Sequence, residues 1–210
     1  MNIVILTLEE AGISYSQIIE LMHESFQERL NQGLHYSCST MDVEQYKEKT
    51  KNGKIFVAID DISGNLAGTT TLNLVDDLSG RHGYMEFVAI SSNYKHCGIG
   101  SMLVDRMRKC GFQEGCDFIL SDTSTQAISA VKFHLKNGFK IIGLESYRST
   151  NYWSYVFRMQ LTPSYLWNSS TFLKMHYWFS YIFIKTTRDI NGNDTTMGII
   201  YKKIRGLCKS

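Results

Sequence analysis

A short glycine-containing segment constrains the fold of this chain more than any other feature, and it reads Lys95-His96-Cys97-Gly98-Ile99-Gly100-Ser101. It follows an apolar, strand-like run at 83–90 and leads into 99–111, where apolar residues recur at helical spacing. Glycine lets an anion approach the backbone, and the first N–H groups of a helix have no partner within that helix. The segment therefore predicts a turn between a strand and a helix that can bind a diphosphate.

Two common nucleotide-binding motifs have a spacing that this segment does not meet. A phosphate loop of the Walker type needs four residues between its glycines and then Lys-Ser/Thr, whereas only Ile99 separates Gly98 from Gly100. A dinucleotide fingerprint needs a third glycine at the position of Leu103. What remains is a shorter turn that could hold the pyrophosphate of coenzyme A.

The pattern of apolar residues and turn signals predicts a layered α/β domain. Strands are expected at 1–8, 54–60, 66–75, 83–90, 117–121, 139–144 and 152–161, and helices at 14–29, 41–51, 99–111 and 124–137. Because residues 61–65 are rich in turn formers, the two strands beside them should form a hairpin. This order predicts an α/β layer sandwich with a mixed sheet.

Composition narrows the class of protein. Of the 210 residues, 43% are apolar and 20% are charged, as is ordinary for a soluble globular protein. The five cysteines are odd in number and lack paired spacing with histidines, so neither a disulfide framework nor a metal site is predicted. A formal charge of +2 argues against nucleic-acid binding. Since neither a secretory signal nor a long apolar run is present, we expect a cytoplasmic protein, at most peripheral to the inner face of a membrane.

Residues 83–143 resemble the central part of the GCN5-related N-acetyltransferase (GNAT) family. The pyrophosphate motif of that family reads Arg or Gln, two residues, Gly, any residue, Gly or Ala, and Lys95, Gly98 and Gly100 occupy its positions. Lys95 departs from the motif but keeps a positive charge. The run 130–139 resembles the family's helix that ends in Gly-Phe, with His134 where a Tyr is usual. Ala127 likewise stands where an Asn is common.

The resemblance implies the acyl-CoA N-acyltransferase fold, with a mostly antiparallel sheet flanked by helices, and acetyl-CoA as the cofactor. A strand that bulges would hold the pantetheine arm and leave one N–H for the thioester carbonyl, whose developing negative charge it would stabilise. The expected coenzyme contacts are Val88, Ala89 and Ile90 on the strand and Lys95, His96, Cys97, Gly98, Ile99, Gly100 and Ser101 in the loop.

Transfer to an amine needs a base and benefits from an acid. Glu86, on the strand that enters the bulge, is the candidate base, and Tyr84 on the same strand face is the second choice. A salt-bridged surface glutamate is the alternative reading of Glu86. His134 could protonate the departing thiolate, because an imidazole with a pKa of about 6.5 has both protonation states within reach. A buried histidine without a proton role is the alternative.

In proteins of this fold the acceptor usually lies between the first two helices, which here points to Glu28, Arg29, His35 and Tyr36. We expect a primary amine on a small polar molecule, such as an amino sugar, acetylated directly in a ternary complex; a polyamine or a peptide amine stays open. The rival function is a non-catalytic acyl-CoA-binding module for regulation or scaffolding, which the departures at His134 and Ala127 keep open.

The sequence also predicts a division of the chain into an acetyltransferase domain at 1–161 and an aromatic, basic extension with helices at 162–210. From Lys185 onward six Lys or Arg residues stand against two Asp. The many aromatic and aliphatic side chains of this extension should be covered. They could pack against the domain or a second subunit in a homodimer, or make weak contact with a membrane surface.

Overall fold

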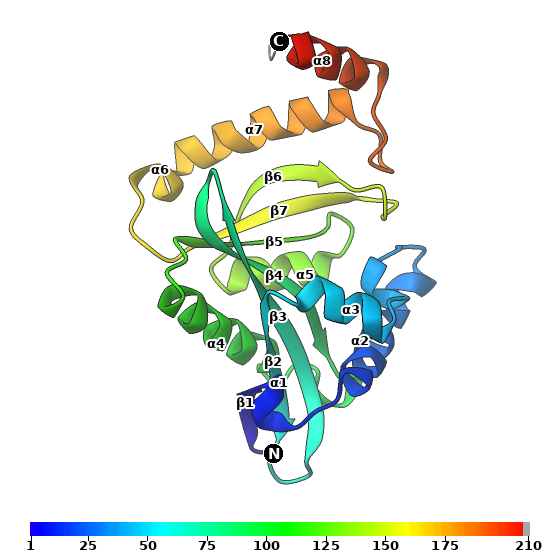
Figure 1. Ribbon diagram of the computed structural model, residues 1–210, viewed down its shortest axis with the longest axis vertical. Coiled ribbons are helices and arrows are strands. Elements are labelled where there is room, and N and C mark those ends of the chain that lie inside the picture. Colours follow the sequence, from blue (N-terminus) through cyan, green and yellow to red (C-terminus); the bar gives the residue numbers. More distant parts are fainter. Residues whose placement is uncertain (208–210) are drawn as a thin grey trace. The chain divides into compact units, whose positions relative to one another are not determined.

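The computed structural model describes residues 1–207 and shows seven strands within them, in the order β1-β2-β3-β4-β5-β7-β6 (Figure 1). Neighbouring strands are antiparallel in the pairs β1–β2, β2–β3, β3–β4 and β6–β7, and parallel in β4–β5. The strands are β1 (Ile3–Thr7), β2 (Gly53–Asp60), β3 (Asn65–Asp77), β4 (Gly80–Ile90), β5 (Phe118–Ser124), β6 (Lys140–Ser146) and β7 (Trp153–Gln160). The prediction of a mixed, mostly antiparallel sheet flanked by helices is confirmed.

Helices connect these strands and follow the last of them. They are α1 (Leu8–Ala11), α2 (Tyr15–Asn31), α3 (Val43–Thr50), α4 (Ile99–Gln113), α5 (Ile128–Lys136), α6 (Tyr165–Asn168), α7 (Ser170–Thr187) and α8 (Thr196–Leu207), with short 3₁₀ turns η1 (Ser37–Ser39) and η2 (Ser92–Tyr94). No helix in the described part of the chain is long and apolar enough to cross a bilayer.

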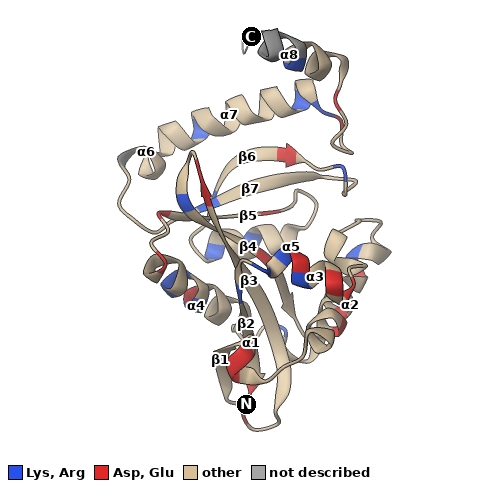
Figure 2. Ribbon diagram, viewed as in Figure 1, with Lys and Arg blue, Asp and Glu red and all other residues tan. Residues whose placement is uncertain are grey.

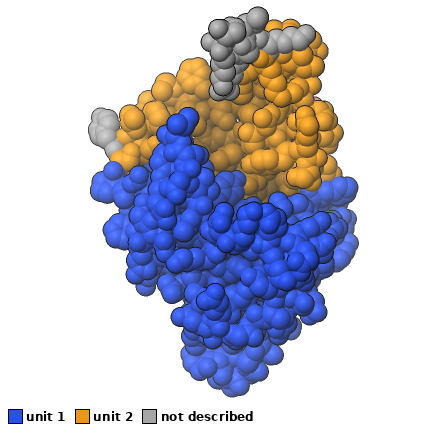
Figure 3. All heavy atoms as spheres, viewed as in Figure 1, with its two compact units in different colours: residues 1–121, 159–163 blue, residues 122–158, 164–210 orange. Residues whose placement is uncertain are grey.

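The chain divides into two compact units, one of residues 1–121 and 159–163 and the other of residues 122–158 with the segment that begins at Ser164 (Figure 3). This division follows spatial contacts and is not continuous in sequence. The boundary expected at residue 161, between a domain and an extension, stays a prediction.

The first unit has helices on both faces of its strands because successive strand residues point to opposite sides. On β2, Ile55 and Val57 pack in one apolar cluster with residues of α2, among them Ile18. Between them Phe56 faces the other way, where the guanidinium of Arg106 on α4 lies 5.3 Å from its ring centroid. The sheet is therefore the middle of three layers, with α2 and α3 over one face and α4 over the other (Figure 1).

Strand β4 carries a bulge near its end. Thr69 pairs with Ala89 and Thr71 pairs with Glu86, so that two residues of β4 stand opposite Thr70 alone. One of these two, Phe87, has a φ of 55°, a value that non-glycine residues rarely adopt. The strand is thus irregular where the family resemblance implied a bulge.

Several element bounds differ from the sequence-based expectation for local reasons. The helix expected from residue 124 begins at Ile128, because β5 continues to Ser124 and the backbone turns at 125–127 before the helix. The strands expected at 66–75 and 83–90 both extend toward each other and join in a second tight hairpin between Asp77 and Gly80. The helix expected at 41–51 begins at Val43, and Asp42 is its N-cap residue.

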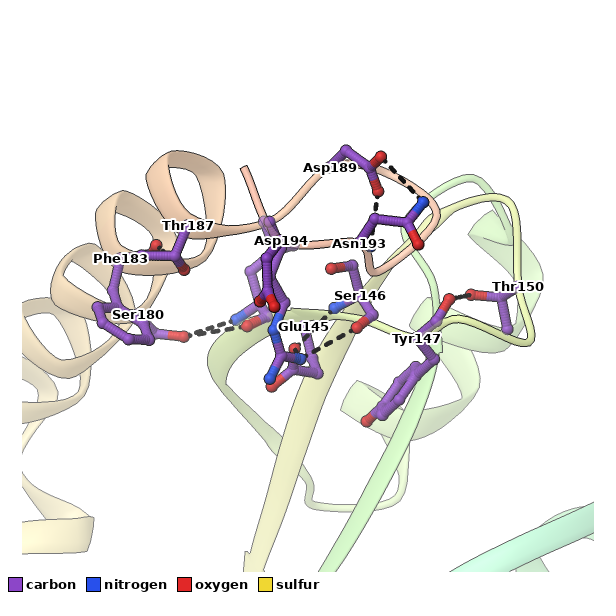
Figure 4. A network of polar contacts seen from close by, with 12 residues as sticks. Glu145, Ser146, Tyr147, Thr150, Ser180, Phe183, Thr187, Asp189, Asn193 and Asp194 are labelled. Atoms are coloured by element: carbon purple, nitrogen blue, oxygen red, sulfur yellow. Dashed lines mark hydrogen bonds and ion pairs between the residues drawn. The ribbon is translucent and has the colours of Figure 1, made fainter. Parts of the chain in front are cut away.

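In the second unit, α7 packs along β6, which is the last strand in the sheet order. Ser180 Oγ accepts a hydrogen bond of 3.0 Å from the Leu144 amide and donates one of 3.2 Å to the Leu144 carbonyl (Figure 4). His176 Nδ1 lies 2.6 Å from the carbonyl oxygen of Ile142. These side chains satisfy backbone groups at the edge of the sheet, which would otherwise be open to another strand.

Candidate coenzyme and acceptor site

The loop between η2 and α4 has a backbone that only a few residue types adopt easily. His96 and Gly98 have φ values of 65° and 79°, both in the left-handed region. Gly98 is also the N-cap residue of α4, and its cap lacks a side-chain hydrogen bond. A Cβ placed on Gly98 would have no heavy atom within 4 Å, so the space in front of this turn is open. The loop therefore leaves room for a ligand against its backbone.

The amide groups of this loop form a run of unused donors. Within residues 1–207, the backbone N–H groups of residues 96–100 have no hydrogen-bond acceptor, whereas those of Ser101 and Met102 bond the Gly98 carbonyl at 3.0 and 3.2 Å. These donors lie at the positive end of the α4 dipole. Consecutive donors of this kind bind phosphate groups, so the loop fits the pyrophosphate of coenzyme A.

Charged and sulfur-bearing side chains flank the same loop. Lys95 Nζ lies 3.7 Å from Glu28 Oε2 on α2, and because both side chains are exposed this ion pair is weak. The structure thus brings Glu28, which was predicted to contact the acceptor, beside the predicted phosphate loop. Cys97 is exposed, and its Sγ donates a 3.6 Å hydrogen bond to the Lys95 carbonyl.

Helix α2 fixes the point at which β4 ends and the loop begins. Ser25 Oγ donates a 3.0 Å hydrogen bond to the Ile90 carbonyl. Glu24 Oε1 accepts bonds from Ser92 Oγ (2.6 Å) and the Ser92 amide (2.9 Å), which lower the pKa of Glu24. Sequence reasoning missed both residues, since no spacing relates them to partners more than 60 positions away. Ser25 thus anchors Ile90, one of the predicted coenzyme contacts, and Glu24 anchors Ser92 two residues later.

A surface depression of about 420 Å³ adjoins the candidate base. Its lining residues are Glu48, Lys49, Lys51, Asn52, Asn73, Leu74, Val75, Tyr84 and Glu86. Asn73 Nδ2 donates a 2.6 Å hydrogen bond to Glu86 Oε2 across the β3–β4 ladder. Glu86 and Tyr84, the two predicted base candidates, therefore lie on the same strand and line the same depression.

Tyr46, on α3, packs against the bulged part of β4. It is fully buried, its ring lies edge-on to Phe87 at 5.2 Å, and its hydroxyl is 3.0 Å from Thr71 Oγ1. Burial raises the pKa of Tyr46 well above its usual value, so this phenol keeps its proton at neutral pH. Thr71 is the ladder partner of Glu86, so the tyrosine indirectly fixes the strand segment that carries the candidate base.

His134 lies in the second unit, on α5, and is packed among aromatic rings. Its ring stacks on Phe157 with a centroid distance of 4.4 Å, and 5% of the residue is exposed. Nδ1 is 2.7 Å from the Ala130 carbonyl oxygen, which can only accept, so Nδ1 carries the hydrogen. Burial lowers the pKa of His134, and the imidazole is neutral at pH 7. These contacts support a packing role, and its role as a proton donor stays a prediction.

The remaining residues predicted to frame the acceptor do not line the depression beside Glu86. Arg29 has its guanidinium 5.5 Å from the ring centroid of Tyr36 and 5.9 Å from that of Phe26. His35 is exposed in the segment between α2 and η1. The depression instead takes its polar lining from α3, β3 and β4, and the α3 residues gave no motif from which sequence could have identified them.

Comparison with known proteins agrees with this architecture. A profile of the Acetyltransferase (GNAT) family matches residues 15–139. An acetyltransferase of the GNAT family from Staphylococcus aureus Mu50 is similar in structure, with a TM-score of 0.58, 19% identity, and coverage of 77% of this chain and 100% of that one.

Two further structures hold a coenzyme. A chain of the NatC complex bound to Gag peptide and CoA has a TM-score of 0.60 at 18% identity, covering 77% of this chain and 100% of that one. A putative acetyltransferase from Salmonella typhimurium, solved with its cofactor acetyl-CoA, has a TM-score of 0.59 at 13% identity over 78% of this chain and 96% of that one. The coenzyme predicted from the sequence is of the kind that these two neighbours hold. By its family match over more than half of its length, this chain belongs to the GNAT family of acetyltransferases.

Proposed function

We propose that this protein transfers the acetyl group of acetyl-CoA directly to a primary amine on a small polar acceptor, within a ternary complex. The observation that carries this proposal is the run of five successive amides at residues 96–100 without an acceptor in the described chain, at the start of α4. His96 and Gly98, which have positive φ values, are both exposed in this segment. Such a surface fits the negatively charged oxygens of a diphosphate.

The residues proposed to hold the coenzyme are those predicted from the sequence. The amides of residues 96–100 bind the diphosphate, Lys95 adds a point charge, and the strand residues Val88, Ala89 and Ile90 lie along the thiol-bearing arm. When bound, acetyl-CoA supplies the thioester carbon that the acceptor amine attacks. The backbone beside the β4 bulge offers an N–H to the developing oxyanion, a contribution worth about 3–4 kcal/mol in comparable sites.

Glu86 is the proposed base. An acceptor ammonium must lose a proton before its nitrogen can attack, and Glu86 lines the depression into which a small acceptor can enter. The hydrogen bond from Asn73 Nδ2 to Oε2 holds the carboxylate of Glu86 in this position. Tyr84, from the same strand, contributes an aromatic wall next to it.

The acceptor is proposed to be small and to carry both polar and charged groups. Glu48 and Lys49 line the depression together with Glu86, and a volume of about 420 Å³ suits a molecule the size of an amino sugar or an amino acid. Glu28, Arg29, His35 and Tyr36 stay candidates for the more distant part of an acceptor. The predicted homodimer likewise stays a prediction.

Calorimetry with acetyl-CoA tests the coenzyme site. Gly98→Glu places a carboxylate where the diphosphate is proposed to bind and puts a non-glycine residue at a positive φ. This variant should have no measurable affinity for acetyl-CoA. Gly12→Glu is the matched control, because Gly12 also has a positive φ (62°) and open space around its Cβ position. The control should bind as the wild type does. Micromolar affinity retained by Gly98→Glu would contradict the assignment.

Turnover distinguishes catalysis from simple binding. Free thiol release should be measured with amino sugars, amino acids, polyamines and peptides as acceptors. An acceptor-dependent rate supports the proposed transferase. Tight binding of acetyl-CoA without turnover on any amine would instead support the non-catalytic binding module.

A further inference from the structure

Helix α7 uses one side to bind the rest of its own unit. Ser180 and His176, one helical turn apart, contact backbone groups of Leu144 and Ile142 on β6. The rise over four helical residues is about 6 Å, close to the roughly 6.7 Å between alternate strand residues. Successive turns of α7 therefore meet the backbone groups of alternate residues along β6. Ile184 and Thr187 continue the buried side of the helix.

The opposite side of α7 is apolar and exposed. Met175, Trp178, Phe179 and Ile182 have 51, 62, 68 and 50% of their surface exposed, respectively. Their spacing of three, one and three residues places them on a single stripe of the helix. Because the other side of α7 already covers β6, this stripe is not needed to close the core of its unit.

Helix α8 extends the same kind of surface. Phe183 on α7 contacts the ring of Tyr201 on α8, with a centroid distance of 5.0 Å. Met197 and Ile200 of α8 are exposed as well. We call the stripe of Met175, Trp178, Phe179 and Ile182 on α7 the apolar face. Its size exceeds the scattered apolar residues that are normal on a protein surface.

The charged residues of helix α7 all have one sign. Helix α7 contains Lys174 and Lys185 but no acidic residue (Figure 2), and the charged residue among the described side chains of α8 is Lys202. The segment between the two helices holds two acidic residues, of which one is in an ion pair. Asp194 pairs with Lys202, and Asp189 accepts hydrogen bonds from Asn193.

We propose that the apolar face docks on an anionic lipid surface. Trp, Phe and Ile side chains inserted at the level of the lipid headgroups, with lysines beside them, are the composition that holds amphipathic helices in a membrane interface. Each lysine near an anionic surface adds about 1 kcal/mol of attraction. A second copy of this chain would instead bring two faces of equal positive charge together. The helix lies on the surface and does not cross it.

Vesicle co-sedimentation of the full-length protein tests this proposal. Wild type should bind vesicles containing 30% phosphatidylglycerol about tenfold more strongly than pure phosphatidylcholine, and the difference should shrink at high salt. Trp178→Gln combined with Phe179→Gln should lower the partition coefficient at least about tenfold. Lys174→Glu should weaken binding to the anionic vesicles and leave binding to the neutral ones unchanged.

Phe112→Gln is the matched control. Phe112 lies on α4 and is 62% exposed, as is Trp178, so its replacement removes an equally exposed aromatic ring outside the apolar face. This variant should sediment with vesicles as the wild type does. The proposal is overturned if wild type does not bind anionic vesicles, or if the double variant binds as well as Phe112→Gln. It is also overturned if light scattering shows a vesicle-free dimer that the double variant dissociates.

Discussion

Asn73 and Glu86 are diagonal neighbours on the β3–β4 ladder, and Asn73 Nδ2 donates a 2.6 Å hydrogen bond to Glu86 Oε2. A carboxylate accepts only, so the amide group must present its nitrogen here. Gly53, the ladder partner of Asn73 on β2, makes room for this side chain, because a Cβ at residue 53 would collide with Asn73 Oδ1. Three adjacent strands thus hold the proposed base in one place.

Glu86→Gln should lower kcat by about 10²–10⁴ if Glu86 is the general base. The defect should narrow at high pH, because more of the acceptor amine is then deprotonated without help. Glu48→Gln serves as the control, since Glu48 lines the same depression but is exposed on α3. Its kcat should change by less than about threefold. Equal losses in the two variants at every pH would contradict the assigned role.

Gly98→Ala and Gly12→Ala should destabilise the protein equally, each by about 1 kcal/mol. Both glycines have a positive φ, and a Cβ at either position would meet no heavy atom of the protein within 4 Å. Only the conformational strain of a non-glycine residue therefore contributes. Urea unfolding without the coenzyme measures the two values. A much larger loss for Gly98→Ala would show that the space in front of the loop is filled by the protein itself.

Gly143→Ala and Ser180→Ala should each destabilise the fold by about 1–3 kcal/mol. The first places a Cβ 2.6 Å from Ser180 Oγ. The second leaves the amide and carbonyl of Leu144 without their partner. Because both changes break the same contact between α7 and β6, the double variant should lose less than the sum of the two.

Ser129→Ala is the control for this pair, because Ser129 is exposed on α5. It should change the unfolding free energy by less than about 0.5 kcal/mol. Additive losses for Gly143→Ala and Ser180→Ala in urea unfolding would show that the two residues do not act through one contact.

His134 should make the protein less stable in mild acid. Burial lowers the pKa of His134, so the folded state binds fewer protons than the unfolded state, whose histidine titrates near 6.5. The unfolding free energy should therefore fall as the pH drops from about 7 through the unfolded value toward the lower folded value. The contribution of one group has a slope of at most about 1.4 kcal/mol per pH unit.

His134→Phe keeps an aromatic ring against Phe157 and should remove this part of the pH dependence. Urea unfolding at pH 7.5 and 5.5 measures the difference. Ser129→Ala, a change at an exposed residue of the same helix that does not titrate, should leave the slope as it is in the wild type. An unchanged slope in His134→Phe would mean that His134 has the same pKa in the folded and the unfolded protein.

Local sequence was enough to predict the framework of this protein. The glycines at positions 98 and 100, the turn-rich residues 61–65 and the cap at Asp42 act on neighbouring residues, and the structure has a loop, a hairpin and a helix start there. The family resemblance added that the sheet is mostly antiparallel and flanked by helices, whereas the strand order comes from the structure. The candidate base could be named because Glu86 stands on the strand that carries the bulge.

Other features depend on residues that meet only after folding. The contact of Ser25 with Ile90 joins positions 65 apart, and that of Ser180 with Leu144 joins positions 36 apart. A single sequence shows which side chains can form hydrogen bonds but not which of many partners each will meet, since the choice depends on how helices and strands pack. The sequence thus determined the strand–turn–helix with its donors, whereas tertiary packing decided how Glu86 is held and which side of α7 stays exposed.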